Sequence, residues 1–281
     1  LMTDPFGNYL CQKLLKHATP EQRTILVKNV APNLVEIALD THGTRALQTM
    51  IEYCAADSTR TLENASPQAQ IEARVQVALI TDALRDNVVR LIQDINGNHV
   101  VQKCLNNLAQ PQNTQFIIDA VSANCVIVGK HKHGCCVLQR CIDFASDEQR
   151  QQLVEEIIAH AHELVQDQYG NYVVQYVLDL NQPQYSEPLV RMFFGSLAVL
   201  SQQKYSSNVI EKCLRYAPPV IRQMLIEELV QSKDLEVMLR DIYANYVIQT
   251  ALDYADEAMK RKIAVCLIPI LPSIRMTPYG R

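Results

Sequence analysis

Seven copies of a five-residue motif place amide, carboxylate and aromatic side chains at a fixed spacing. Position one is usually Asn, position two is often aromatic, and position five is Gln or Glu in every copy. Amides carry both a donor and an acceptor, and a carboxylate only accepts, so both suit the hydrogen-bonding edges of nucleic-acid bases. The copies are Asn8–Gln12, Thr44–Gln48, Asn98–Gln102, Cys135–Gln139, Asn171–Gln175, Ser207–Glu211 and Asn245–Gln249.

Helix geometry separates the motif into two faces. At about 100° per residue, positions one, two and five fall on one arc, and positions three and four point to the opposite side. Positions three and four hold only Leu, Val, Ala, Cys or Ile. We therefore expect positions three and four in the core, and positions one, two and five in a recognition strip.

Position two adds flat groups that could stack on bases. Tyr, His or Arg occupies it in five copies, and the small Cys136 and Asn208 predict weaker stacking in the other two. A cation directly follows four of the motifs, which would give the strip a positive charge. The position-two residues are Tyr9, Arg45, His99, Cys136, Tyr172, Asn208 and Tyr246, and the cations are Lys13, Lys103, Arg140 and Lys212.

The spacing of the copies predicts the scaffold. Their last residues lie 36 to 38 residues apart, except for one step of 54 residues between Gln48 and Gln102. Such a period is typical of an α-solenoid, in which each repeat packs on its neighbours. Thr19–Gln22 and Ser146–Gln149 read as capping boxes that begin helices. Asn181–Pro188 reads as a connection, and Leu189–Leu200 as a helix.

The long step and the chain end predict two further features. The surplus falls at about residues 55–70, which we interpret as a surface loop inserted between repeats. Residues from about 255 to 281 read as a C-terminal cap, in which Thr277–Gly280 echoes the turn before a motif.

Composition excludes some classes of protein. No apolar run is long enough to span a bilayer, and no N-terminal signal pattern is present. Cys104, Cys141 and Cys213 each lie two residues after a motif and read as buried thiols, which fits a reducing compartment such as the cytoplasm. The net charge of −4 argues against nucleic acid unless the basic groups gather on one face.

The motifs, their period and the preceding turns resemble the Pumilio/PUF family of single-stranded RNA-binding proteins, over essentially the whole chain. The resemblance is greatest to a classical mRNA-regulating member from a fungus or similar eukaryote. It implies an all-α fold: one domain over residues 1–281, a curved right-handed α-solenoid of seven three-helix repeats of ~36 residues plus the cap. Family members usually have eight repeats, so these would be the second to eighth, with the first upstream of Leu1.

The family's reading rule carries over repeat by repeat. Asn with Gln implies uracil, Cys135 with Gln139 implies adenine, and Ser207 with Glu211 implies guanine. Thr44 with Gln48 departs from the common pairs and suggests adenine. Because the family binds RNA antiparallel, the motifs spell 5′-UGUAU(A)U-3′.

The resemblance also implies the partners. The protein is expected to be a monomer that binds mRNA 3′ untranslated regions and recruits a deadenylase complex and translational repressors. No cofactor, membrane or catalytic role is expected, since the chain has no phosphate-binding loop or nucleophile elbow.

Two other functions compete with this interpretation. A HEAT or armadillo-type solenoid could grip an extended peptide with an Asn ladder, but the Ser/Glu and Cys/Gln changes are better explained by different bases. His131, His133, Cys135 and Cys136 could bind zinc, but the repeat register explains these residues more simply, since Gly134 and Cys135 match Gly170 and Asn171. Structural zinc sites also usually need paired ligand clusters.

Overall fold

The structure, a computed structural model, describes residues 1–64, 67–108 and 110–275, with residues 57–64 described for their backbone only. Every regular element in these ranges is a helix, which confirms the predicted all-α class. The chain forms two compact units, Leu1–Leu153 and Val154–Arg281, and the boundary falls inside helix α11.

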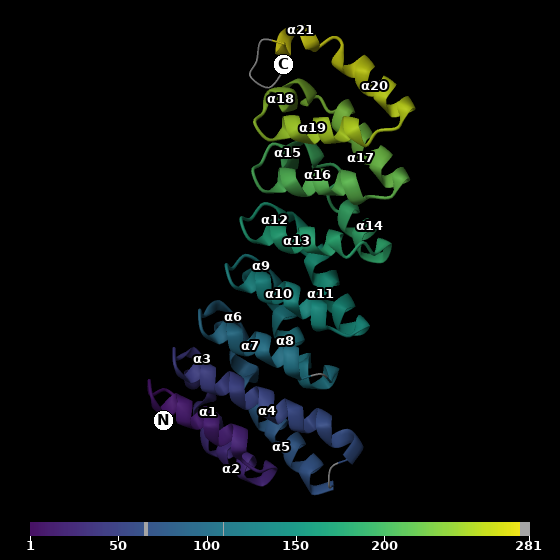
Figure 1. The fold of residues 1–281 in the computed structure, drawn as a ribbon. Helices are drawn as coiled ribbons and strands as arrows, with labels where there is room; N and C mark the ends of the chain where they lie inside the picture. The colour runs from purple at the N-terminus through teal and green to yellow at the C-terminus, as the bar shows by residue number, and fades with distance from the viewer. Residues whose placement is uncertain (65–66, 109, 276–281) are drawn as a thin grey trace. The chain divides into compact units, whose positions relative to one another are not determined.

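The first unit contains four motif helices (Figure 1). Helix α1 packs on α4, α4 on α7, and α7 on α10, so the motif helices form one row. The short helices that precede α4, α7 and α10 form a second row, and the helices that follow the motif helices form a third row. The bounds are α1 Gly7–His17, α2 Pro20–Val30, α3 Leu34–Leu39, α4 Gly43–Asn64, α5 Pro67–Leu84, α6 Val88–Gln93, α7 Gly97–Asn107, α8 Pro111–Ala123, α9 Cys125–Gly129, α10 Gly134–Phe144 and α11 Asp147–Ala159, with 3₁₀ turns η1 Ala31–Asn33 and η2 Arg85–Asn87.

The second unit repeats this arrangement with three motif helices, α13, α16 and α19. Helix α16 packs between α13 and α19, and α20 packs on α17. The bounds are α12 Ala161–Val165, α13 Gly170–Asp179, α14 Pro183–Arg191, α15 Leu197–Ser201, α16 Ser206–Tyr216, α17 Pro219–Gln231, α18 Leu235–Arg240, α19 Ala244–Asp253, α20 Glu257–Leu267 and α21 Leu271–Ile274.

Motif positions three and four form the core in six copies, as predicted. All twelve of these side chains are buried, from Ala46 and Leu47 to Val247 and Ile248. The first copy differs, because Leu10 is 53% exposed and Cys11 is only partly covered. Helix α1 packs on α4, and Leu10 lies on a part of α1 that α4 does not cover.

Two helices begin as the sequence predicts. Thr19 and Gln22 form a capping box, with Thr19 N donating to Gln22 Oε1 at 3.0 Å and Gln22 N donating to Thr19 Oγ1 at 3.3 Å. Ser146 and Gln149 make the same pair of bonds at 3.0 and 3.3 Å. Each pair satisfies backbone donors that the first helical turn leaves unpaired.

The surplus residues of the long step are helical, so the prediction of an inserted loop at 55–70 is wrong. Helix α4 has 22 residues, twice the 11 of α7, and α5 has 18 residues. No Gly or Pro lies between Gly43 and Asn64 to end α4, and Pro67 occupies the first position of α5, where its missing N–H costs nothing. Residues 65 and 66 lie outside the described part.

The prediction of a helix over Leu189–Leu200 is also wrong. Helix α14 begins at Pro183 and ends at Arg191, and α15 begins at Leu197. Gly195 adopts a φ of 81°, which breaks the helix between them. The carboxylate of Glu228, on α17, accepts from Gly195 N at 2.9 Å and from Leu197 N at 3.2 Å, and so holds this turn in place.

The predicted C-terminal cap falls partly within the last repeat. Helix α20 follows the motif helix α19 as α17 follows α16, and α21 packs on α18. The Thr277–Gly280 turn lies outside the described residues. In the described ranges, no helix combines the length and the apolar character that crossing a membrane requires.

Candidate functional site

A recurrent turn fixes the start of each motif helix. In five repeats an Asp carboxylate, four residues before position one, accepts from two backbone N–H groups at 2.6–2.9 Å. His131 Nδ1 takes the place of this carboxylate in the fourth repeat, at 3.2 and 3.4 Å. Sequence reasoning missed this role, although the recurrence was visible. The carboxylates belong to Asp4, Asp40, Asp94, Asp167 and Asp241.

In the first repeat, the hydrogen bonds of this turn favour the charged form of Asp4. At Asp4, the backbone N–H groups of Gly7 and then Phe6 lower the pKa of the carboxyl below its usual value. The negative charge also lies at the N-terminal end of a helix dipole, where it is stabilised.

A glycine lets the preceding short helix approach the motif helix closely. A Cβ on Gly97 would lie 2.7 Å from the carbonyl oxygen of Leu91, and one on Gly134 would lie 2.1 Å from that of Val128. These distances are too short for a side chain to be added without backbone movement. In the repeats that carry this glycine, the close approach sets the position of the motif.

Position one lies at the floor of the strip and is 1–5% exposed in every copy. In the Asn copies the side-chain Nδ2 donates to backbone carbonyls of the preceding turn. Asn171 Nδ2, for example, reaches Asp167 O at 2.8 Å and Gln168 O at 3.0 Å. These bonds fix the amide orientation and leave Oδ1 facing position five.

Position five is tied to position one in five repeats. The Gln Nε2 donates to the side-chain oxygen of position one at 2.9–3.1 Å, in the pairs Asn8/Gln12, Thr44/Gln48, Asn98/Gln102, Asn171/Gln175 and Asn245/Gln249. Each Gln keeps one N–H for a ligand, and Oε1 remains available as an acceptor, although Gln12 Oε1 also accepts from Thr49 Oγ1 at 3.4 Å. A donor beside an acceptor complements the adjacent N3–H and carbonyl groups of uracil.

The two remaining repeats present different groups. Cys135 Sγ lies 3.5 Å from Lys132 O, and burial raises the pKa of this thiol to about 12, so it is neutral at physiological pH. Gln139 makes no side-chain hydrogen bond among the described residues. Ser207 Oγ donates to Lys204 O at 3.3 Å, and the carboxylate of Glu211 accepts from Arg215 and Thr250. The seven reading positions therefore share one backbone frame but differ in donors and acceptors.

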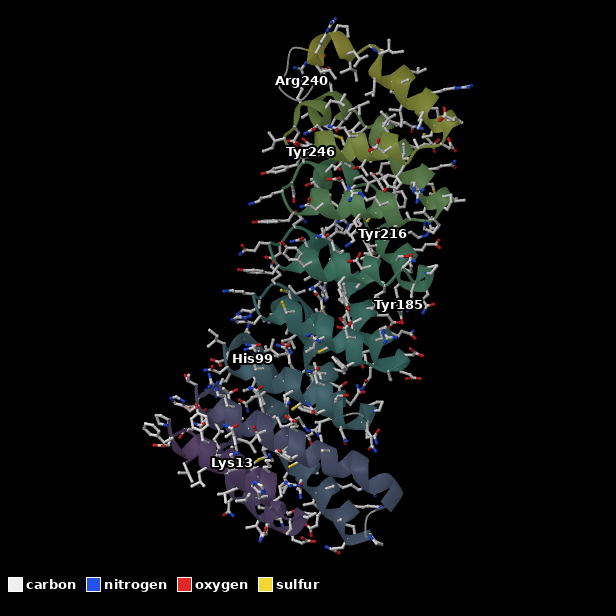
Figure 2. The ribbon with its side chains drawn as sticks, viewed as in Figure 1. Lys13, His99, Tyr185, Tyr216, Arg240 and Tyr246 are labelled. Carbon is white, nitrogen blue, oxygen red and sulfur yellow. The ribbon has the colours of Figure 1, made fainter. Side chains whose placement is uncertain are left out.

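Position two projects from this floor and is exposed in every repeat. Tyr9, Tyr172 and Tyr246 have 53–58% of their surface exposed. In the second unit, a groove between α13 and α16 is lined by Tyr172 and Gln175 on one side and by Asn208 and Glu211 on the other. Tyr216 and Tyr246 extend from α16 and α19 (Figure 2). A planar ligand entering the groove could thus contact stacking and hydrogen-bonding groups together.

Two of the four predicted cations already have carboxylate partners. Lys103 Nζ lies 2.7 Å from Glu52 Oε2, and Lys212 Nζ lies 2.5 Å from Asp179 Oδ2. In both cases the carboxylate belongs to the preceding motif helix. Lys13 and Arg140 have no ion-pair partner among the described residues. The positive charge of the strip is smaller than the sequence suggests.

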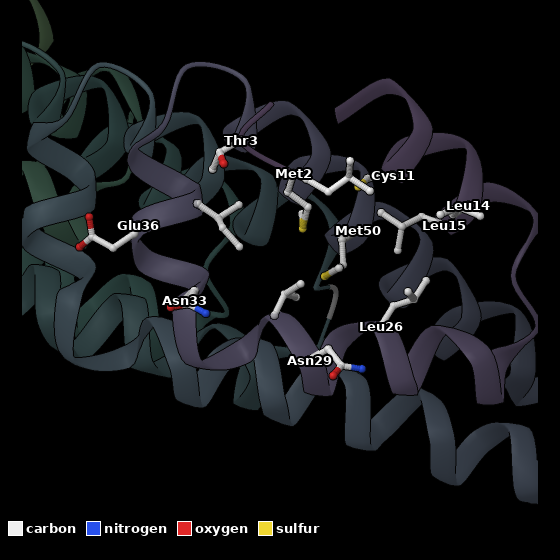
Figure 3. Close-up of a pocket in the computed structure, with 13 residues that line it drawn as sticks. Met2, Thr3, Cys11, Leu14, Leu15, Leu26, Asn29, Asn33, Glu36 and Met50 are labelled. Atoms are coloured by element: carbon white, nitrogen blue, oxygen red, sulfur yellow. The ribbon is translucent and has the colours of Figure 1, made fainter. Parts of the chain in front are cut away.

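Two other candidate sites of the first unit, an apolar pocket and a possible metal site, do not repeat the hydrogen-bonding and stacking arrangement of the strip. A pocket between α1, α2 and α4 is lined mostly by apolar side chains, including Met2, Leu14, Leu15, Leu26 and Met50 (Figure 3). In the described ranges, no group of three or more His, Cys, Asp and Glu side chains is placed to hold a metal. His131 instead accepts backbone hydrogen bonds at the place where other repeats have Asp.

Comparison with known proteins identifies the repeats. The Pumilio-family RNA binding repeat matches residues 1–31, 33–67, 87–122, 124–158, 160–192, 197–230 and 240–267. A Pumilio domain-containing protein of Schizosaccharomyces pombe is 49% identical over all of this chain and 39% of its own length. Pumilio homolog 12 of Arabidopsis thaliana is 38% identical over all of this chain and 45% of its own length. The chain thus spans less than half of these relatives.

Solved structures of similar sequence contain RNA. The Puf4 RNA binding domain, bound to a 3′ UTR recognition sequence of HO endonuclease RNA, is 40% identical with a TM-score of 0.81, over 99% of this chain and 84% of that one. The RNA-binding domain of yeast Puf5p, bound to AAT2 RNA, is 31% identical with a TM-score of 0.83, over 99% and 82% of the two chains.

Proposed function

Because the chain belongs to the Pumilio family of RNA-binding repeat proteins, we propose that it binds UGUA-type elements in mRNA 3′ untranslated regions and reads 5′-UGUAU(A)U-3′. The observation that carries this proposal is the change of donors and acceptors along one constant frame. Four Asn/Gln pairs present the same oriented amide, and the Ser207/Glu211 pair presents a carboxylate. A constant frame with variable polar groups is what recognition of successive bases requires.

The assignment of guanine to Ser207/Glu211 has a direct chemical reason. Guanine presents two neighbouring donors, N1–H and N2–H, on its Watson–Crick edge, and a carboxylate can accept from both. Gln in the same place would direct its N–H group at one of these donors. Adenine at Cys135/Gln139 is assigned by family resemblance, with weak stacking by Cys136. Thr44/Gln48 is the least specific position, because this pair departs from the common pairs of the family and the Thr44 hydroxyl is already bonded to Asn96 O and Gln48 Nε2.

RNA binding by this chain would serve post-transcriptional repression or mRNA decay. We propose that the protein acts as a monomer in the cytoplasm, recruits a deadenylase complex and translational repressors, and performs no catalysis itself. The repeats match the RNA-binding class rather than the HEAT or armadillo class of solenoid. The two cation–carboxylate pairs near the strip are consistent with few phosphate contacts.

A fluorescence-anisotropy titration tests the base-reading proposal. The labelled RNA contains UGUAUAU, and the matched control RNA differs only by U in place of G. We expect about 5- to 150-fold weaker binding of the control, the range typical of one lost bidentate base contact. Equal binding of the two oligonucleotides would refute sequence-specific reading.

A further inference from the structure

The residue that follows each motif reaches back to the preceding motif helix in four repeats. Lys103 and Lys212 reach Glu52 and Asp179, which lie one turn after position five of those helices. Thr49 Oγ1 lies 3.4 Å from Gln12 Oε1, and Thr250 Oγ1 lies 2.9 Å from Glu211 Oε2. The two threonines therefore contact the base-reading side chain of the neighbouring repeat itself.

The contact at Glu211 is the more constrained of the two. Thr250 is only 6% exposed, and its side chain has a single rotatable bond that positions the hydroxyl. The Glu211 side chain is 17% exposed and lines the groove between α13 and α16. A hydrogen bond from a buried hydroxyl to this carboxylate fixes the orientation of both of its oxygens.

A second donor occupies the same oxygen. Arg215 Nη2 donates to Glu211 Oε2 at 3.0 Å from one turn farther along α16, while Oε1 has no partner among the described residues. Two donors fill the two lone-pair sites of Oε2. A guanine that engages both oxygens must therefore displace one of these donors. The Arg215 side chain is 49% exposed and flexible, whereas Thr250 is buried, so Arg215 is the group that can move.

We propose that Thr250 is a positioning residue that determines specificity for the base read one repeat earlier. Its hydroxyl holds Glu211 Oε2, directs Oε1 to the groove, and remains bonded when Arg215 yields to the base. This inference rests on the proposed function, since it assumes that Glu211 reads guanine. It assigns part of the specificity of one repeat to a residue of the next.

RNA-binding measurements on the wild-type protein and three variants test this role. Thr250→Val removes the hydroxyl at nearly constant size, Thr250→Ser retains it, and Thr49→Val is the matched control at the equivalent place beside Gln12. Each protein, with its melting temperature checked, is titrated with UGUAUAU and with RNAs carrying A, C or U in place of G. A further RNA replaces the U read by Asn171/Gln175.

Thr250→Val is expected to lower the preference for G over the other bases by about tenfold, as for a lost hydrogen bond to a charged group. Its discrimination at the Asn171/Gln175 base should be unchanged, Thr250→Ser should restore the G preference, and Thr49→Val should leave it intact. A purely structural role would weaken binding to every RNA alike. Retention of the full G preference by Thr250→Val overturns the inference. A wild-type protein without G preference would overturn the proposed function, and this inference with it.

Discussion

Exchanging one pair of motif side chains for another should change the base that the protein prefers at one position of the RNA. In the double variant Ser207→Asn/Glu211→Gln, the sixth repeat receives the pair that the fifth repeat carries at Asn171 and Gln175. We expect the preferred base at that position to change from guanine to uracil.

The two repeats have the same local backbone, so the new pair should adopt the existing geometry. Ser207 N bonds to Gln203 O at 3.0 Å, as Asn171 N bonds to Asp167 O at 3.2 Å. An Asn side chain at 207 would find the carbonyls of Gln203 and Lys204 where Asn171 finds its partners at 2.8 and 3.0 Å. Ser207 Oγ already reaches Lys204 O at 3.3 Å. Gln at 211 could then bond to the new Asn, as Gln175 does to Asn171 at 2.9 Å.

The magnitude follows from the groups exchanged. The variant replaces an acceptor-only carboxylate by an amide that directs a donor at one guanine donor and provides a donor–acceptor pair for uracil. A bidentate side-chain contact to a base contributes about 1–3 kcal/mol of discrimination, which corresponds to about 5- to 150-fold in relative affinity. Competition anisotropy with UGUAUAU and UUUAUAU measures this ratio. Replacing the U read by Asn171/Gln175 provides a control, because its penalty should not change. A double variant that still prefers guanine would show that the assigned register is wrong.

Three further outcomes follow from the described geometry. Burial raises the pKa of the Cys104, Cys141 and Cys213 thiols to about 12, so these thiols stay protonated at pH 8. They should resist alkylation by iodoacetamide in the native protein, while the exposed Cys136 reacts. Mass spectrometry of the native and the denatured protein after treatment checks this. Modification of these three in the native state would contradict their burial. Gly97→Ala should lower the free energy of unfolding by about 1–3 kcal/mol, because the new Cβ would collide with Leu91 O. Urea titration measures this loss. The control is Ala244→Gly, at the equivalent position of the seventh repeat, which should lower the free energy of unfolding by at most about 1 kcal/mol. RNA affinity should depend modestly on salt, with log K falling by no more than about 3 per tenfold rise in salt concentration. Each phosphate contact to a single strand contributes about 0.7 to this slope, and the strip offers four cations. A much steeper slope in anisotropy titrations would show that cations outside the strip also contact the RNA.

Local patterns in the sequence were sufficient for the repeat architecture and for the division of the motif. Positions along one helix have fixed angular relations, so the apolar pair at positions three and four could be assigned to the core, as it is in six repeats. Capping boxes are equally local, and both were predicted correctly. Leu10 was not, because burial depends on a neighbouring helix, and α1 has a motif helix packed on only one side.

The long step shows where local reading failed. Composition rich in Ala, Ser, Thr and Asn suggested a loop, yet without Gly or Pro the helix α4 continues to Asn64. Similarly, Pro188 suggested a connection, but α14 includes it and the break occurs at Gly195, where Glu228 stabilises the turn from 31 to 33 residues away. Propensity is a weak guide where packing or distant hydrogen bonds decide the outcome.

The sequence by itself determined which residues occupy the seven motif positions and how the motifs are spaced, because motif and period are properties of the chain. Only the tertiary structure decided how those residues are presented. Position one is buried and its amide is oriented by backbone carbonyls, and the carboxylate of Glu211 is held by Thr250, 39 residues later in the chain. The contact between Thr250 and Glu211 exists only after one repeat has packed on the next, since stacking brings together groups that the linear sequence keeps a full repeat apart.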